Sequence, residues 1–238
     1  MRILFILSCL LVNVSLHALT DKFRCIIRDN PATTMCIGWN QVNSQNPVIY
    51  YDVIDNGMNY NLYAFSQNVD RSTSTKGMNN RFSRLTNLQP NTVYYFLIKD
   101  DNSTSARFSF KTSPDVNTER LSFIAGGDSR NNRVPRQNAN LIVAKTRPNA
   151  VLFGGDMTNG DSNGEWADWF DDWQYTISSD GRMTPIIAAR GNHEGANSSI
   201  HDLFDTPTSD VYYAITFGGD LYRAYTLNSM LSVSGSQK

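Results

Sequence analysis

The sequence has no excess of charge of either sign and contains no basic run. Its 21 Lys and Arg residues stand against 22 Asp and Glu residues, which gives a formal net charge of −1. Nucleic acids and anionic membrane surfaces are therefore not expected partners. After the N-terminus no apolar segment is long enough to cross a bilayer, so we expect no membrane span in the mature protein.

Cysteine and histidine are also scarce, with three of each in 238 residues. Cys9 lies in an apolar run over 3–14, which follows a short basic start and precedes Ala18 at a plausible cleavage point. This pattern is typical of a secretory signal peptide. We expect it to occupy residues 1–18 and to direct the protein to secretion or to a periplasm.

The other two cysteines flank a turn signal at equal distances. Cys25 and Cys36 lie on either side of residues 29–32, so a hairpin with that turn would bring them face to face. In an exported protein we then expect a Cys25–Cys36 disulfide. Two free buried thiols remain the alternative, because cross-strand disulfide geometry is demanding.

Residues 19–113 have an all-β pattern. The polar tract 68–80 is expected to be a loop, and the short apolar segments around it predict a β-sandwich of seven strands. The expected strands are 23–27, 34–39, 48–53, 60–64, 81–85, 93–98 and 106–110. The segment 88–95, Leu-Gln-Pro-Asn-Thr-Val-Tyr-Tyr, resembles the tyrosine corner of fibronectin type III domains, and Trp39 fits that family's core. Nothing in this part resembles a catalytic site.

After a short linker at 113–118, strands alternate with helices, which predicts an α/β domain over 119–238. Helices are expected at 135–145 and after Ser162, where Glu165 has capping-box spacing. The stripe of Trp166, Trp169, Phe170, Trp173 and Ile177 is expected to pack on the sheet. The acidic residues between them, Asp168, Asp171 and Asp172, are expected to be solvated. Two further strands are expected at 211–217 and 221–227.

Three apolar strands in this domain end in glycine and then an oxygen-bearing side chain. They run over 121–125, 150–153 and 185–189, and lead to Asp128, Asp156 and Asn192. We expect these side chains to converge at the carboxyl ends of neighbouring strands. Hard oxygen ligands suit ions such as manganese, iron, magnesium or zinc, and a carboxylate can bridge two of them. His193 could then hydrogen-bond a phosphate oxygen or protonate a leaving group.

These motifs resemble those of the calcineurin-like metallophosphoesterases, and a fibronectin-like domain ahead of them resembles the layout of purple acid phosphatases. The resemblance implies a binuclear centre of iron, manganese or zinc that hydrolyses a phosphate-ester substrate. By position, Asp128 would bind the first metal, Asp156 would bridge both and Asn192 would bind the second. His193 would face the phosphate.

The sequence departs from these families in three ways. Asn159 stands where purple enzymes have a tyrosine, so no purple chromophore is expected, and Arg130 stands where many relatives have a histidine. Both could contact phosphate. Relatives also have two later motifs with three metal-binding histidines, whereas this sequence offers only His201, in an expected surface loop. We therefore expect an incomplete α/β phosphoesterase sandwich that is inactive alone. An exported binding module on a dead scaffold is the alternative.

Overall fold

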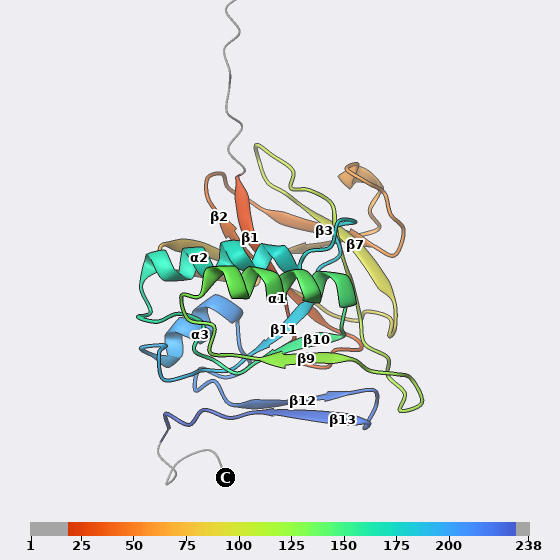
Figure 1. The fold of residues 1–238 in the computed structure, drawn as a ribbon. Coiled ribbons are helices and arrows are strands. Elements are labelled where there is room, and N and C mark those ends of the chain that lie inside the picture. The colour runs from red at the N-terminus through yellow and green to blue at the C-terminus, as the bar shows by residue number, and fades with distance from the viewer. Residues whose placement is uncertain (1–18, 232–238) are drawn as a thin grey trace, which may run out of the picture.

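The computed structural model describes residues 19–231, which form a β-sandwich joined to a layered α/β part (Figure 1). In the α/β part, α1 (Arg133–Thr146) and α2 (Asn163–Trp173) cover one face of three parallel strands. These strands are β9 (Phe123–Gly126), β10 (Ala150–Phe153) and β11 (Pro185–Ala188). The hairpin of β12 (Tyr213–Phe217) and β13 (Tyr222–Thr226) lies on the opposite face (Figure 1). The predicted fold class is confirmed.

The sandwich has its core between two antiparallel layers. One layer contains β1 (Thr20–Ile26), β2 (Met35–Gln41), β5 (Arg71–Thr75) and β6 (Met78–Leu85). The other has the order β4-β3-β7-β8, with β3 at Val48–Asp52, β4 at Phe65–Asn68, β7 at Val93–Lys99 and β8 at Phe108–Lys111. Trp39, Phe96 and Phe110 are fully buried between them. The predicted tyrosine corner is confirmed, because the Tyr94 hydroxyl accepts from the Gln89 amide at 2.8 Å.

Two sequence predictions in the sandwich are wrong. Residues 60–64 were expected as a strand but contain a 3₁₀ helix, Tyr60–Leu62, followed by β4. The tract 68–80 was expected as a loop but contains β5 and the start of β6. The β5 sequence, Arg-Ser-Thr-Ser-Thr, has no buried residue, so an edge strand of this kind lacks the apolar alternation by which strands are recognised.

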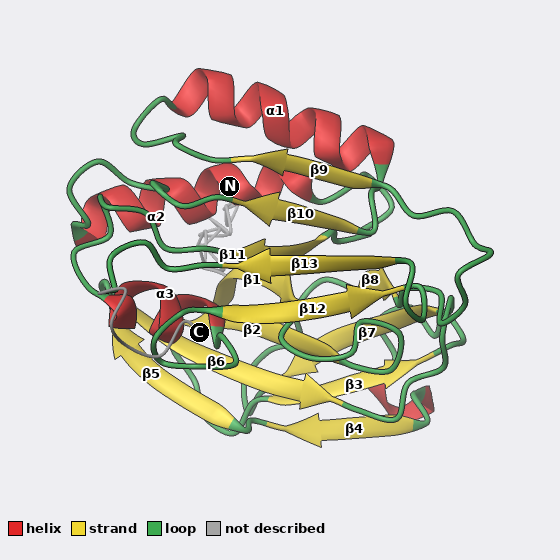
Figure 2. Ribbon diagram, turned by 90° about the horizontal axis from the view of Figure 1, so that it is seen from below, coloured by secondary structure: helices red, strands yellow, loops and turns green. Residues whose placement is uncertain are grey.

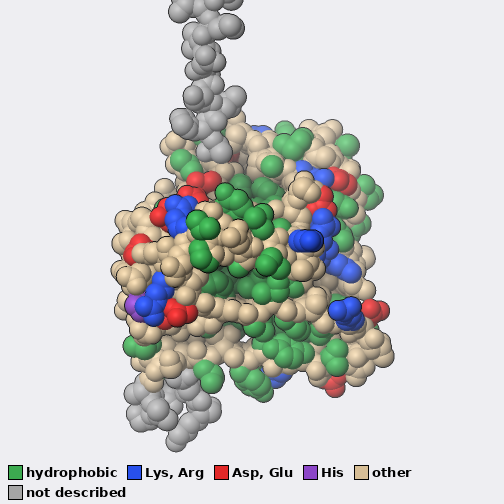
Figure 3. All heavy atoms as spheres, in the orientation of Figure 1, with side chains coloured by type: hydrophobic (Ala, Val, Ile, Leu, Met, Phe, Trp, Pro, Cys, Tyr) green, Lys and Arg blue, Asp and Glu red, His purple; other side chains and the backbone are tan. Residues whose placement is uncertain are grey.

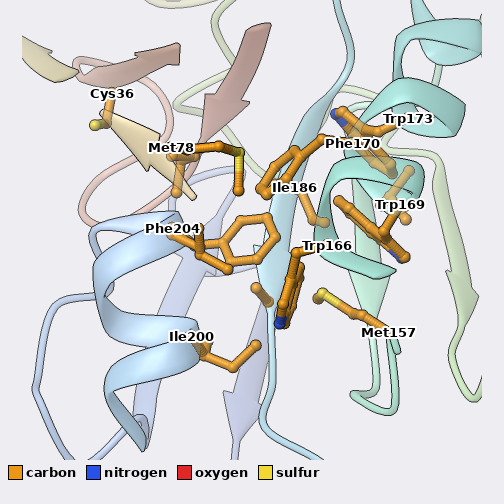
Figure 4. Close-up of a cluster of buried hydrophobic side chains, with 14 of the residues drawn as sticks. Cys36, Met78, Met157, Trp166, Trp169, Phe170, Trp173, Ile186, Ile200 and Phe204 are labelled. Carbon is orange, nitrogen blue, oxygen red and sulfur yellow. The ribbon is translucent and has the colours of Figure 1, made fainter. Parts of the chain in front are cut away.

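The helix α2 forms where its local sequence predicts it. Ser162 Oγ accepts from the Glu165 amide at 3.3 Å, and Glu165 accepts from the Ser162 amide at 2.9 Å, which completes the capping box. Trp166, Trp169, Phe170 and Trp173 are buried, and Figure 4 shows them packed with Ile186 and Phe204. The stripe therefore attaches α2 to the sheet and to α3 (Asn197–Phe204).

Asp172 is not solvated, contrary to the sequence prediction. It is fully buried, and its carboxylate accepts hydrogen bonds from Arg133 (2.9 Å), Arg136 (2.5 Å) and Gln137 (2.7 Å), all on α1. Asp168 keeps an exposed side chain and pairs with Arg133 at 2.7 Å. An acidic residue that faces a neighbouring helix's arginines is buried because its charge is compensated there.

The sandwich and the α/β part share one sheet. Strand β1 pairs in parallel with β11, through Cys25 with Pro185 and Ile26 with Ile186. The result is a seven-stranded sheet with the order β5-β6-β2-β1-β11-β10-β9. Arg24 on β1 is fully buried at this junction, where its Nε donates to the Leu203 carbonyl at 2.7 Å and its Nη2 to Asn80 Oδ1 at 2.6 Å.

The predicted disulfide between Cys25 and Cys36 is wrong, and both thiols are free and buried. In the β1–β2 hairpin Cys25 pairs with Ile37, and Cys36 pairs with Ile26. This register is one residue away from the predicted one, and a shift of one residue turns a side chain to the other face of a sheet. Cys25 consequently packs in the sandwich core, whereas Cys36 packs in the α/β core (Figure 4).

Among residues 19–231, no helix combines the length and apolar character that crossing a bilayer requires. The predicted signal peptide at 1–18 lies outside the described residues.

Candidate functional site

Three strand-end loops meet at one edge of the parallel strands. The loops follow β9, β10 and β11, which are neighbours in the sheet. The Asp128 amide donates to the Gly155 carbonyl and the Arg130 amide to the Asp156 carbonyl, both at 2.9 Å. The His193 amide donates to Asp156 Oδ1 at 3.0 Å. The structure thus brings the loops of all three predicted motifs together.

Close approach of these loops requires glycine at two positions. A Cβ on Gly191 would lie 2.5 Å from the Asp156 nitrogen and closer still to Oδ1. Gly155 has a φ of +91°, and a Cβ there would lie 2.7 Å from the Gly191 Cα. Asp128 and Asp156 themselves have φ values of 52° and 54°, in the left-handed region that non-glycine residues rarely adopt. Such conformations cluster at functional sites, which draws attention to both carboxylates.

Two of the predicted ligands are open to solvent. Asp128 and Asn192 are exposed, whereas Asp156 is half-buried. Arg130 Nε donates to Asp128 Oδ1 at 2.6 Å, so a guanidinium group lies beside the first predicted ligand. Figure 3 shows side chains of both charges at the side of the molecule where these loops lie.

His193 has a defined orientation. Its Nδ1 lies 2.7 Å from the Asn159 carbonyl oxygen, which can only accept a hydrogen bond. Nδ1 therefore carries a proton, and in the neutral ring Nε2 is the acceptor. The backbone of Asn159 thus positions the predicted catalytic histidine, through a contact that no local sequence pattern reveals.

Glu194 holds the loops after β10 and β11 together, a role that the sequence does not predict. It is fully buried, and its carboxylate accepts from the amides of Asp156 (3.0 Å), Met157 (2.7 Å) and Gly191 (2.7 Å). Burial raises the pKa of Glu194, while these three hydrogen bonds oppose the rise. The acidic residue after the histidine was visible in the motif, but its partners lie on two separate loops.

His201 is not in a surface loop as expected. It lies in α3, half-buried, with Nδ1 3.0 Å from Thr206 Oγ1. Burial, followed by the charge of Arg71, lowers the pKa of His201. No contact of the three strand-end loops involves it among the hydrogen bonds of residues 19–231.

The side chains of the three candidate ligands are of the chemical type that a hard metal ion prefers. Asp128, Asp156 and Asn192 offer carboxylate and amide oxygens on three adjoining loops, and such oxygens suit manganese, magnesium or iron. Within the part of the chain that the structure describes, no group of three or more His, Cys, Asp and Glu residues is placed to hold a metal ion. The three loops therefore present oxygen-bearing side chains of a suitable type, with His193 beside them, but in the described residues they do not form a metal-holding cluster.

Two family models match the two parts of the chain. Residues 21–112 match the family model of the purple acid phosphatase N-terminal domain. Residues 131–235 match that of the calcineurin-like phosphoesterases, which includes Asp156, Asn192 and His193 and begins three residues after Asp128. Together the two matches cover most of the chain.

Two Mycobacterium tuberculosis proteins, named uncharacterized protein MT2654 and uncharacterized protein Rv2577, are each 23% identical to this chain over 234 residues. Each alignment covers 86% of this chain and 42% of the relative, so the chain spans less than half of their length.

Two solved structures share the fold. The purple acid phosphatase PPD1 from seeds of yellow lupin (Lupinus luteus) has a TM-score of 0.66 at 14% identity, over 83% of this chain and 43% of that protein. A structure of PhoD has a TM-score of 0.54 at 10% identity, over 82% and 49% of the two chains. The chain therefore combines a segment that matches the purple acid phosphatase N-terminal domain with a following segment that matches the calcineurin-like phosphoesterases, and it shares the fold of both solved structures.

Proposed function

We propose that this chain is the amino-terminal portion of an exported, metal-dependent phosphoesterase of the acid phosphatase type. The observation that carries the proposal is that three strand-end loops meet at one edge of the sheet. Hydrogen bonds of Asp128, Asp156 and His193 join these loops. Residues 1–18 would direct export as a signal peptide. The substrate would be a phosphate ester.

The site residues would share the work as follows. Asp128, Asp156 and Asn192 would hold two ions of iron, manganese or zinc, with Asp156 between them. When bound, such a pair supplies a nucleophilic hydroxide and stabilises the charge of the transferred phosphoryl group. His193, oriented at Nδ1 by the Asn159 carbonyl, would act as the imidazolium, in which Nε2 also carries a proton and can donate to a phosphate oxygen or protonate the leaving oxygen. Arg130 and the Asn159 side chain would contact the phosphate.

We further propose that the chain by itself is not a competent enzyme. A binuclear site uses about four to six ligands per ion, and these loops offer three oxygen-bearing side chains. Water completes a coordination shell weakly and does not orient the ions as protein ligands do. The activity of the whole protein would depend on further ligands.

The test is hydrolysis of a chromogenic phosphate monoester and a diester by the 238-residue chain with manganese, iron or zinc. We expect weak metal binding by calorimetry and turnover no higher than a metal-only control. The Asp156→Ala variant is the matched control. Robust turnover that disappears in this variant would contradict the inactivity and support the catalytic site.

An exported binding module on an inactive scaffold is the second candidate. It is favoured by the ion pair of Arg130 with Asp128, which engages one proposed ligand without a metal. If this candidate is correct, Arg130→Ala and the unmodified chain will both show no manganese uptake. If the enzyme proposal is correct, the Arg130→Ala variant will bind manganese more tightly than the unmodified chain, because Asp128 no longer pairs with a guanidinium group.

A further inference from the structure

The turn between β5 and β6 brings the sandwich against the candidate site. Lys76 and Gly77 form this turn with φ values of 52° and 73°. A Cβ on Gly77 would lie 3.5 Å from the side chain of Asn163, at the start of α2. Figure 2 shows the end of β5 beside α3, at the side of the molecule where the loops after β10 and β11 lie.

Lys76 makes two contacts with a single residue of the α/β part. Its Nζ donates to the Asp161 carbonyl at 2.7 Å and forms an ion pair with Asp161 Oδ2, also at 2.7 Å. Both side chains are largely buried, with exposed fractions of 18% for Lys76 and 12% for Asp161. An ion pair at this depth is screened much less by solvent than a surface pair.

Asp161 in turn joins the two loops that carry the predicted ligands. It lies five residues after Asp156, and its Oδ2 accepts from the Gly195 amide at 3.0 Å and from Ser199 Oγ at 2.8 Å. Its Oδ1 accepts from Trp166 Nε1 at 2.7 Å. Since Gly195 is only two residues after His193, this carboxylate holds the loop after β11 against the loop after β10.

We propose that Lys76 is a positioning residue of the candidate site. Its ammonium group fixes Asp161, and Asp161 fixes the loop that presents Asn192 and His193. The purple acid phosphatase N-terminal domain would then help to shape the site from outside the phosphoesterase domain. The part of this inference that concerns metal binding rests on the proposed function.

The physical reason lies in the charge balance of Asp161. Lys76 is the only charged donor among its hydrogen-bond partners within residues 19–231, since Trp166, Ser199 and the Gly195 amide are neutral. A largely buried carboxylate without a counter-charge is strongly unfavourable. Loss of the ammonium group would therefore open the junction until water reaches Asp161, and the Gly195 amide would lose its fixed partner.

The experiment compares Lys76→Met, Lys76→Arg and a matched control in the 238-residue chain. The control is Lys22→Met, because Lys22 also lies in the sandwich, is 12% exposed and pairs with Asp171 of α2 at 2.9 Å. Amide hydrogen exchange measures the order of the loops at 156–161 and 190–196, and needs no metal. Calorimetry with manganese alone measures the site's affinity.

In Lys76→Met we expect both loops to exchange about tenfold faster, because the opening that exposes their amides becomes more frequent. We also expect manganese affinity about tenfold weaker, the low end for residues that orient metal ligands. Lys76→Arg should restore both, and Lys22→Met should leave both unchanged. Unchanged loops in Lys76→Met, or the same loosening of these loops in Lys22→Met, would overturn the proposal. If the unmodified chain takes up no manganese, the proposed function fails, and the exchange measurement alone decides the role of Lys76.

Discussion

Single atoms decide how closely the site loops approach. Gly191 lies against the carboxylate and the backbone of Asp156, where no side chain can be accommodated without movement. The glycine that precedes Asn192 is therefore a packing requirement of the site as well as part of its motif. It couples the position of one predicted ligand to that of another.

Substitution of Gly191 by alanine should separate the two loops. The added methyl group would overlap Asp156, and overpacking of this kind costs about 1–3 kcal/mol of the free energy of unfolding. Denaturant unfolding measures this loss. Gly126→Ala is the control, since its Cβ would meet nothing within 4 Å, and it should change stability by less than about 0.5 kcal/mol. Equal effects of the two variants would contradict the close approach.

A local sequence pattern marks the candidate ligands, but no local pattern marks the residues that hold their loops in place. Asp128, Asp156 and Asn192 each follow an apolar strand and a glycine, which is a local pattern. The role of Asp161 depends on Lys76 and Gly195, which are 85 and 34 residues away from it. No local pattern reveals such partners, because they become neighbours only when the sheet has formed.

At the scale of elements, α2 shows which information is local. Its capping box and aromatic stripe lie within the helix and its first turn, so the sequence predicts its start and its buried face. The environment of Asp172 depends on the packing of α1 against α2, and the sequence prediction fails there. A helix wheel marks Asp172 as polar but cannot show that arginines face it.

Asp172 should make a pH-dependent contribution to stability. Burial acts to raise its pKa, but hydrogen bonds from Arg133, Gln137 and Arg136 outweigh burial and lower the pKa below 3.8. The ionised form therefore stabilises the fold above pH 3.8, and this stabilisation is lost as the pH falls below that value.

We expect Asp172→Asn to lower the free energy of unfolding by about 3 kcal/mol at neutral pH, because it removes the carboxylate that compensates the charge of the buried Arg136. The variant should also lose less stability than the unmodified chain on acidification below about pH 4. Urea unfolding across this pH range measures both. Asp168→Asn, at the exposed end of the same network, should cost less than about 1 kcal/mol. An equally large loss of stability in Asp168→Asn would contradict the conclusion that the buried carboxylate of Asp172 is the main partner of the arginines on α1.

The β1–β2 register leads to a prediction about thiols. Burial raises the pKa of Cys25 and Cys36, so neither forms the reactive thiolate readily in the folded protein. We expect both thiols to resist alkylation at pH 8 and to react fully in denaturant without a reducing agent. Mass spectrometry of peptides from the exported protein counts the modified cysteines. A mass loss of two hydrogens in a peptide pair would contradict the register.

At the scale of the whole molecule, the shared sheet should make unfolding a single event. Breaking β1 from β11 exposes apolar faces of both parts and the buried guanidinium of Arg24. Neither part can therefore unfold without destabilising the other, although the sequence suggests two separate domains.

Trp39→Phe allows this to be tested, since three of the four tryptophans, Trp166, Trp169 and Trp173, then remain as reporters in α2. Their fluorescence follows the α/β part, whereas far-UV circular dichroism follows the whole chain. We expect the same thermal midpoint from both signals. Two resolved midpoints would show that the parts unfold independently.

The parallel contact of β1 with β11 also bears on how such proteins exchange their parts during evolution. The two family matches, 21–112 and 131–235, lie on either side of the linker. The seven-stranded sheet nevertheless contains strands from both segments, joined by continuous backbone hydrogen bonding. An N-terminal segment transplanted from a relative must carry a first strand whose free edge accepts Pro185 and Ile186 in register. Recombination at the linker is thus constrained by a strand that lies almost a hundred residues before the crossover point.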